Sequence, residues 1–248
     1  LVNQFVGLEN FRYVITSGDF WAGVGRVVNY TLIQVPIMII AALALAMIID
    51  SFVVKHISGF RLGYFLPYAI PGVVASIIWV YLYNGQISPL VKGLAAPGIN
   101  VDFFADNIVL ASMANITTWT FTGYNMLIFY SSLSTIPHSL YEAASIDGAS
   151  EWQIVKSIKI PELKGSLAIT VIFSIIGSFQ LFNEPNILQN MVPGNAITTY
   201  YTPNMYAYNL SFSGNQSNYA AAMAIVMAVI TMAIAYAVQL NSMKEQMK

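Results

Sequence analysis

The sequence contains no cysteine and very little charge. Without Cys, the chain has no disulfide, no thiol nucleophile and no cysteine metal site. Only 8% of its 248 residues are Asp, Glu, Lys or Arg, whereas an ordinary soluble domain carries about a quarter. The net charge is −1, which offers no basic surface to nucleic acid. These absences exclude a soluble enzyme, a nucleic-acid binder and a disordered chain, and they leave an integral membrane protein.

Long apolar runs fill much of the chain, of which 57% is hydrophobic. A helix that crosses a membrane needs about 20 mainly apolar residues. Five stretches reach this length: 27–49, 60–83, 107–133, 166–188 and 219–240. They do not alternate every second residue, as the strands of a membrane barrel do. We therefore predict an all-α fold, a polytopic bundle of membrane helices.

Basic residues are distributed unevenly between the two ends of these stretches. One side receives Lys55, Arg61, Lys156, Lys159, Lys164, Lys244 and Lys248, and the other receives Arg12, Arg26 and Lys92. Because Lys and Arg are enriched in cytoplasmic loops, we expect loop 135–165 and tail 241–248 to be cytoplasmic. Loop 189–218 and segment 1–26 are then external. An external start needs a segment that carries it across, so we expect a sixth span ahead of Leu1.

The loop at 135–165 contains signals for two short helices joined by a sharp turn. Two pairs have the spacing of capping boxes: Ser139 with Glu142, and Ser150 with Gln153. Gly148 stands between them and can take the left-handed conformation that ends a helix. Pro161 is expected to stop the second helix, because it cannot continue the hydrogen-bond pattern.

The second of these helices is predicted to be amphipathic. Its apolar residues recur every three positions, at Trp152, Val155 and Ile158. Lys156 and Lys159 are expected to face water or lipid headgroups. Such a hairpin either lies on the membrane surface or enters a groove on a partner protein. The small Ala143 and Ala144 favour the second alternative, because they keep the first helix thin.

This loop resembles the EAA loop of binding-protein-dependent ABC importer permeases. The family pattern is E-A-A-x3-G-x9-I-x-L-P, and Glu142-Ala143-Ala144, Gly148 and Ile158-x-Ile160-Pro161 match it, with Ile160 in place of Leu. Three further segments are similar to the sugar-permease branch, especially the larger maltose-permease subunit type: Phe5-Val-Gly-Leu-Glu-Asn-Phe11, Leu66-Pro-Tyr-Ala-Ile-Pro71 and Gly177-Ser-Phe-Gln-Leu-Phe-Asn-Glu-Pro185. The resemblance covers nearly the whole chain.

The resemblance implies a type I ABC importer transmembrane domain over residues 27–240, in a bacterial cell (inner) membrane. It also implies the partners: a second permease subunit, a cytoplasmic ATPase dimer, an extracellular or periplasmic solute-binding protein and an oligosaccharide substrate. In the family this loop docks into the ATPase. The residues that carry the coupling by resemblance are Glu142, Ala143, Ala144, Asp147, Gly148, Ile158 and Pro161.

No nucleotide-binding loop of the form Gly-x4-Gly-Lys-Ser/Thr occurs in the chain. ATP and Mg are therefore expected on the partner ATPase, with no cofactor on this chain, which is a transport subunit and not an enzyme. His56 and His138 lack metal-ligand spacing, so no metal site is expected. An intramembrane enzyme is disfavoured by the absence of His-Glu-x-x-His and Gly-x-Ser-x-Gly.

Two polar stripes run through the third and fourth apolar stretches. Polar groups avoid lipid, so these stripes are expected to face the bundle interior or an aqueous path. The predicted substrate-path residues are Asn115, Thr118, Trp119, Thr122, Asn125, Gln180, Asn183 and Glu184. Neutral amides and hydroxyls beside aromatic rings suit a sugar. The alternative is that these groups only join helices by hydrogen bonds.

Three further features lie in the apolar stretches, and the first two have two interpretations each. Glu184 is either a solvated carboxylate at the interface or a group that binds sugar hydroxyls or gates the path. Pro67 and Pro71 are expected to make a fixed kink rather than a flexing point. Ala220, Ala224 and Ala228 are expected to form a close-packing seam. The alternative function is a self-sufficient secondary transporter of a neutral polar solute, which would show internal repeats and coupling carboxylates.

Overall fold

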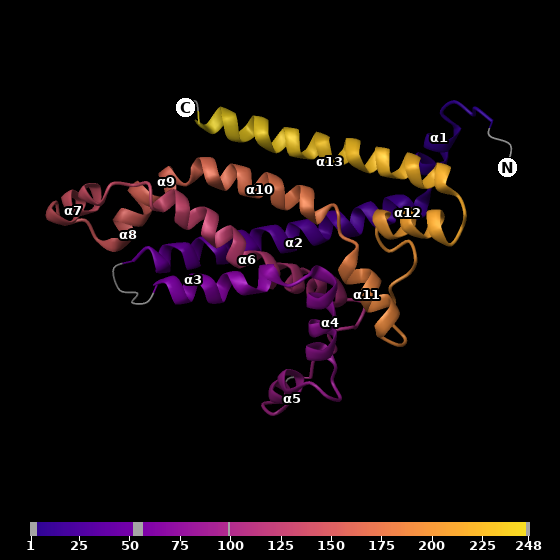
Figure 1. Ribbon diagram of the computed structural model, residues 1–248, viewed down its shortest axis with the longest axis horizontal. Helices are drawn as coiled ribbons and strands as arrows, with labels where there is room; N and C mark the ends of the chain where they lie inside the picture. Colours follow the sequence, from indigo (N-terminus) through magenta and orange to yellow (C-terminus); the bar gives the residue numbers. More distant parts are fainter. Residues whose placement is uncertain (1–3, 52–56, 99, 247–248) are drawn as a thin grey trace.

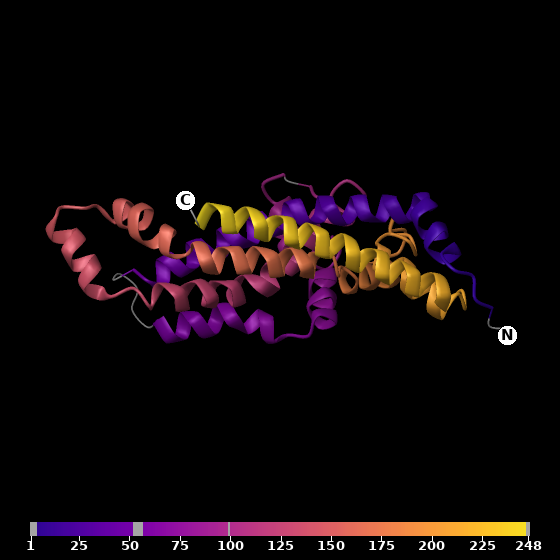
Figure 2. The same cartoon turned by 90° about the horizontal axis from the view of Figure 1, so that it is seen from above.

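The computed structural model describes residues 4–51, 57–98 and 100–246. Lys55, His56 and Lys248, considered above, lie outside these ranges. Every regular element in the described ranges is a helix, which confirms the predicted fold class. Long helices run side by side, as Figure 1 shows, and the view from above in Figure 2 shows the same arrangement.

The first long helix begins earlier than the sequence predicts. A short helix, α1 (Glu9–Thr16), is followed directly by α2 (Gly18–Ile49). Ser17 caps α2 by accepting a hydrogen bond from the Phe20 backbone N–H. Asp19 lies in the first turn, where its negative charge interacts favourably with the positive end of the helix dipole. Segment 1–26 therefore holds α1 and the start of α2, where we expected only a preceding segment.

The predicted span at 60–83 is broken rather than kinked. It consists of α3 (Ile57–Phe65), a 3-10 turn η1 (Leu66–Ala69) and α4 (Gly72–Tyr83), and the two helical arms meet at 97°. Pro67 lies in the 3-10 turn and Pro71 precedes α4. Neither proline can donate a backbone hydrogen bond, so the helix is interrupted there and α4 leaves at an angle of 97° to α3. α5 (Pro89–Ala95) follows α4 outside the bundle.

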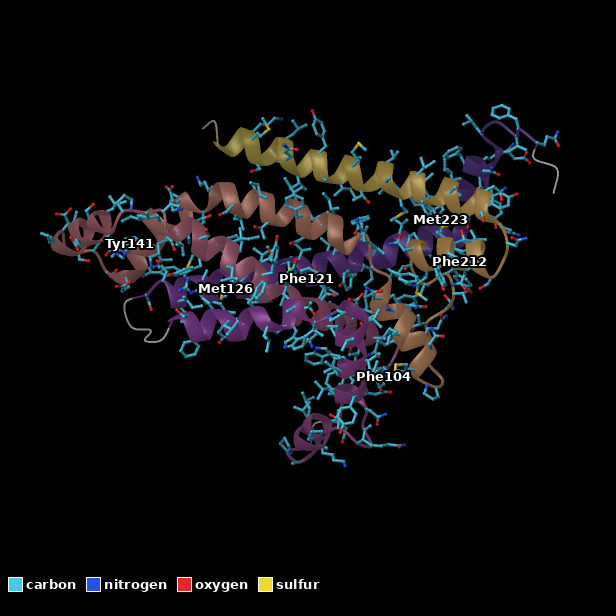
Figure 3. All side chains as sticks on the ribbon, in the orientation of Figure 1. Phe104, Phe121, Met126, Tyr141, Phe212 and Met223 are labelled. Carbon is cyan, nitrogen blue, oxygen red and sulfur yellow. The ribbon has the colours of Figure 1, made fainter. Side chains whose placement is uncertain are left out.

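α6 (Val109–Leu133) packs along α2 and forms the centre of the bundle. Met38 and Ala42 of α2 share one buried cluster with Met126 and Phe129 of α6, and Met126 is labelled in Figure 3. On another face, Gly123 lets the backbone of α3 approach: a Cβ at this position would lie 1.7 Å from the Tyr64 carbonyl oxygen.

The predicted span at 166–188 is also interrupted. α10 (Lys164–Ser178) ends before Phe179, and α11 (Asn183–Met191) starts in a new direction. Side chains from a later segment hold this break: Asn204 Nδ2 donates to the Phe179 carbonyl at 3.0 Å, and Thr202 Oγ1 donates to the Leu181 carbonyl at 3.0 Å. These side-chain hydrogen bonds satisfy the two carbonyls where the helix is interrupted.

The predicted loop at 189–218 is not a simple connection. It contains α12 (Pro203–Phe212), whose Met205 is fully buried, and it leads into α13 (Ser217–Gln246). Ala220 of α13 is buried, but Ala224 and Ala228 line an open groove of 580 Å³ between α13 and α10. The alanine seam is therefore not closed within this chain.

Three helical ranges in the described part are long and apolar enough to cross a membrane: α2, Lys164–Met191 and Ser217–Lys244. The bent pair Ser58–Ala69 and Gly72–Tyr83 adds a fourth if it counts as one span. α6 has 25 residues, about 37 Å at 1.5 Å per residue, but its polar side chains make it less apolar. The chain thus has the architecture of a multi-pass membrane bundle.

Candidate functional site

A helical hairpin extends from one end of the bundle (Figure 1). It comprises α7 (His138–Ile146), α8 (Glu151–Ile154), a π-helical turn η2 (Val155–Lys159) and α9 (Ile160–Glu162). The C-terminal end of α13 lies at this same end of the bundle, and α1 lies at the opposite end. We call the segment from His138 to Glu162 the coupling hairpin.

The turn of the coupling hairpin depends on Gly148, as predicted. Its φ is +82°, in the left-handed region that favours glycine. The N–H of Gly148 donates to the Ser145 carbonyl at 3.1 Å, and the N–H of Ala149 donates to the Ala144 carbonyl at 2.9 Å. These two bonds form a Schellman motif, which satisfies carbonyls that the end of α7 leaves free.

One of the two predicted capping boxes forms. Ser150 Oγ accepts from the Gln153 backbone N–H at 3.4 Å, and the Ser150 backbone N–H donates to Gln153 Oε1 at 2.7 Å. The box predicted at Ser139 and Glu142 is wrong, because α7 already begins at His138 after Pro137. Ser139 therefore lies inside the helix, and α7 has no side-chain cap at its start.

Removing the observed cap should loosen the second arm of the hairpin. Ser150→Ala is expected to cost about 1 kcal/mol of local stability, because the Gln153 N–H loses its acceptor. Amide hydrogen exchange at residues 151–154 should become faster, while exchange in α7 stays unchanged. Ser145→Ala is a suitable control, since its hydroxyl only donates back to the Tyr141 carbonyl. Unchanged exchange in the Ser150 variant would contradict the role of this cap.

Pro161 does not end the second helix, contrary to the prediction. It occupies the first turn of α9, where the missing N–H costs nothing. The π-helical turn just before it shifts the hydrogen bonds, so that the N–H of Ile160 donates to the Val155 carbonyl. The chain then passes into α10 with the Leu163 N–H bonded to the Lys159 carbonyl at 3.1 Å.

The same π-helical turn changes which side of the helix is buried. Ile154 and Lys159 are buried, whereas Trp152 is 70% exposed. In an α-helix, residues five apart point about 140° away from each other, but a π-turn aligns them through its i→i+5 bonds. The predicted exposure of Lys159 is therefore wrong, while Lys156 is exposed as expected. Of the predicted apolar side, Trp152 is exposed, and Val155 and Ile158 are half-buried.

Most of the predicted coupling residues lie on the surface of the hairpin. Glu142, Ala143, Asp147, Gly148 and Pro161 are exposed, and Ala144 and Ile158 are half-buried against the bundle core. Three large apolar side chains are exposed beside them, Leu140, Ile146 and Trp152. Ile146 is 86% exposed. The sequence could have indicated this exposure, because Ile146 stands immediately before Asp147, at the turn.

Tyr141 forms the inner side of the hairpin, as Figure 3 shows. Its ring is buried and lies 5.2 Å from Lys159 Nζ. Burial, together with the nearby carboxylates of Asp50 and Glu162, raises the pKa of Tyr141 to about 12. The phenol is therefore neutral at cellular pH, and its ring can contact the Lys159 ammonium without charge of its own.

The predicted substrate-path residues are not gathered in one place. Of the α6 stripe, Asn125 is buried and donates to the Phe121 carbonyl at 3.0 Å, while Thr118 and Thr122 are half-buried. Asn115 is exposed in the N-terminal part of α6, and its side-chain amide donates to the Tyr83 hydroxyl at 2.8 Å. Trp119 is half-buried and contacts Trp79 edge to face.

A cavity of 140 Å³ lies where α2, α6 and α10 meet. Its lining combines amides and hydroxyls with rings: Gln34, Met38, Thr117, Phe121, Tyr124, Asn125, Phe173, Ser174, Gly177 and Ser178. Tyr124 also stacks on Tyr68 at 4.5 Å between ring centroids. The sequence analysis missed Gln34, although a glutamine in so apolar a span is itself a signal.

Of the polar stripe predicted on the fourth stretch, Ser174 and Gly177 line this cavity. The residues beyond the helix break at Phe179 do not line it. Gln180 lines the groove between α10 and α13, and Asn183 is exposed. Glu184 faces α6, where it accepts a hydrogen bond from the Thr117 hydroxyl at 3.3 Å. Thr117 in turn accepts from the Tyr30 hydroxyl at 2.7 Å. Glu184 is thus half-buried and is part of a polar chain between helices.

Comparison with known proteins identifies the family. The model of the family described as "Binding-protein-dependent transport system inner membrane component" matches residues 14–242. The chain belongs to this family. The permease is 30% identical to the probable ABC transporter permease protein YurN of Bacillus subtilis, over 93% of this chain and 80% of that protein. It is 31% identical to the lactose transport system permease protein LacF of Rhizobium radiobacter, over 94% of this chain and 79% of that protein.

The fold of this permease also matches a solved structure. It superimposes with a TM-score of 0.87 on a chain of a bacterial ABC transporter involved in the import of the acidic polysaccharide alginate. The match covers 98% of the permease and 85% of that chain at 19% identity. The architecture of an ABC importer transmembrane domain is therefore confirmed. Among the residues that the structure describes, no cluster of His, Cys, Asp or Glu could hold a metal ion.

Proposed function

We propose that this permease imports an oligosaccharide, driven by a separate ATPase that docks on the coupling hairpin. The substrate class is supported by the lactose transport relative and by the lining of the 140 Å³ cavity, which pairs Gln34 and Asn125 with Phe121 and Tyr124. Neutral donors, neutral acceptors and flat apolar rings are what a sugar needs. This combination is the observation that carries the proposal.

The coupling hairpin presents an exposed surface on which the ATPase can dock. Leu140, Ile146 and Trp152 are large apolar side chains exposed on the coupling hairpin, and exposed apolar patches mark interaction sites. Glu142 and Asp147 stand beside them and can pair with basic residues of a partner. The hairpin and the end of α13 are then cytoplasmic, as the distribution of basic residues predicts.

The complete transporter contains more than this chain. A second permease subunit forms the other half of the path, and an ATPase dimer binds ATP and Mg. An external or periplasmic solute-binding protein delivers the sugar at the opposite end of the bundle, near α1 and α12. The description of the family as binding-protein-dependent supports this assembly. We expect the assembly to reside in the bacterial inner membrane.

Uptake by purified components tests the proposal. The permease is reconstituted into liposomes with its companion permease and ATPase subunits, and the binding protein is added with a radiolabelled oligosaccharide. Sugar should accumulate only with ATP on the ATPase side and with loaded binding protein. If liposomes with this chain alone accumulate sugar in an ion gradient, the protein is a self-sufficient secondary transporter and the proposal is wrong.

The cavity can be tested by one substitution. Asn125→Leu keeps the number of side-chain heavy atoms and their branching but removes the amide from the cavity, and sugar transport should fall about tenfold, as for the loss of one or two hydrogen bonds. The matched control is Asn115→Leu on the same helix, because Asn115 lies in a separate groove with Trp79 and Tyr83. Transport by the control should stay within about twofold of wild type. An equal loss in both variants would argue against the cavity.

A further inference from the structure

The coupling hairpin is joined to the end of α2 by an ion pair. Lys159 Nζ lies 2.7 Å from Asp50 Oδ2, and the two side chains are only 5% and 13% exposed. Lys159 is the last residue of the π-helical turn η2, and Asp50 is the residue that ends α2. It is the one salt bridge found within residues 4–51, 57–98 and 100–246.

The position of Asp50 makes it dependent on Lys159. A carboxylate at the C-terminus of a helix lies beside the negative end of the helix dipole, which disfavours it, and the last turn of α2 contains no basic residue. Oδ2 of Asp50 is buried without a hydrogen bond to any other described group. The positive charge of Lys159 therefore compensates both the negative charge of Asp50 and the negative end of the α2 dipole.

Three parts of the chain meet at the Lys159 ammonium. η2 supplies Lys159, α2 supplies Asp50, and α7 supplies Tyr141, whose ring centroid lies 5.2 Å from Nζ. The π-helical turn is what directs Lys159 inward, because it puts residue 159 on the buried side together with Ile154. Any displacement of α7 or η2 therefore moves a group that is held against the end of α2.

α2 extends from this ion pair to the cavity. It is one helix with a proline inside it, Pro36, and Met38, which lies on the Asp50 side of that proline, lines the 140 Å³ space. The part of α2 from Met38 to Ile49 contains no proline or glycine and packs along α6, so it is expected to move as a rigid body, since packed cores do not deform gradually. The ion pair and the cavity wall are thus two points of the same rigid element.

We propose that the Lys159–Asp50 pair is a positioning contact that transmits the movement of the coupling hairpin to α2, and so links ATP hydrolysis to the cavity. The inference rests on the proposed function of the hairpin. It concerns residues that do not touch the ATPase, because both are buried under the hairpin. The hairpin keeps its own shape without them, through the Schellman motif at Gly148 and the capping box at Ser150.

The complete reconstituted transporter tests the pair. Lys159→Gln and Asp50→Asn are compared with wild type for subunit composition, ATP hydrolysis with and without loaded binding protein, and sugar transported per ATP. Both variants should retain the ATPase subunit but lose the stimulation of hydrolysis. Sugar transported per ATP should fall about tenfold, within the usual range of coupling between two sites. The control is Lys164→Gln, an exposed lysine in α10 that lies outside the coupling hairpin and should behave as wild type.

A charge exchange separates coupling from a simple structural role. The double variant Lys159→Asp with Asp50→Lys should recover at least about half of the wild-type stimulation, because the opposite charges still meet. Wild-type sugar per ATP in the single variants overturns the proposal, and so does an exchange variant that assembles but does not recover. If the single variants lose the ATPase subunit and the exchange restores it, the pair only holds the fold. A wild-type permease that binds no ATPase would instead refute the proposed function.

Discussion

Replacing Gly148 with valine is expected to leave the permease in the membrane but to abolish transport. At a φ of +82°, a β-branched residue costs about 1–3 kcal/mol of strain, and the turn between α7 and α8 should open. Nothing lies within 4 Å of the position that a Cβ would take, so the effect comes from backbone conformation and not from a clash. ATP-dependent uptake in reconstituted liposomes should fall to background, and the ATPase subunit should no longer co-purify.

The size of this effect should follow the conformational preference of the new residue. Gly148→Asn should be milder than Gly148→Val, because asparagine tolerates the left-handed region. The control is Gly165→Ala in α10, where a Cβ also meets nothing within 4 Å and the backbone is helical. It should transport as wild type. Full uptake by the valine variant would show that the turn does not matter for coupling.

Replacing Gly123 with valine should destabilise the bundle itself. A Cβ at this position would lie 1.7 Å from the Tyr64 carbonyl oxygen and 2.4 Å from the Tyr64 carbonyl carbon. Both are backbone atoms, which cannot rotate away, so α3 must separate from α6. Overpacking of a core commonly costs about 1–3 kcal/mol and occasionally more, and a backbone clash of this size belongs at the upper end. Thermal unfolding in detergent should occur at a clearly lower temperature.

A glycine on the partner helix provides the matched control. At Gly63, in α3, an added Cβ meets nothing within 4 Å. Gly63→Ala should therefore unfold at the wild-type temperature or slightly above it, since alanine favours the helix. Equal unfolding temperatures for Gly123→Val and wild type would contradict the close approach of α3 and α6.

The features that the sequence predicted correctly are local. The left-handed turn at Gly148 and the capping box at Ser150 involve residues at most a few positions apart, so their spacing contains the necessary information. The apolar runs fixed the membrane class for a similar reason, because the length of a spanning helix follows from the bilayer. The EAA resemblance then indicated the family from some twenty residues.

The features that the sequence missed depend on distant residues or on a change of helical period. The break after Phe179 is held by Asn204 and Thr202, which no local pattern connects with it. Lys159 was placed on the wrong side because the prediction assumed 3.6 residues per turn, whereas a π-helical turn precedes Pro161. The break after Phe179 also separates Gln180 and Asn183 from the cavity, and of the predicted α6 residues only Asn125 lines it.

The coupling hairpin is expected to lie in the cytoplasm and to be held there by the ATPase. The chain has no cysteine, so Ile146→Cys provides a single thiol at the hairpin tip, where Ile146 is 86% exposed. A membrane-impermeant maleimide should label it in inside-out vesicles stripped of the ATPase, and added ATPase should protect it. No label should appear in intact spheroplasts. Labelling of this thiol from outside the cell would contradict the account.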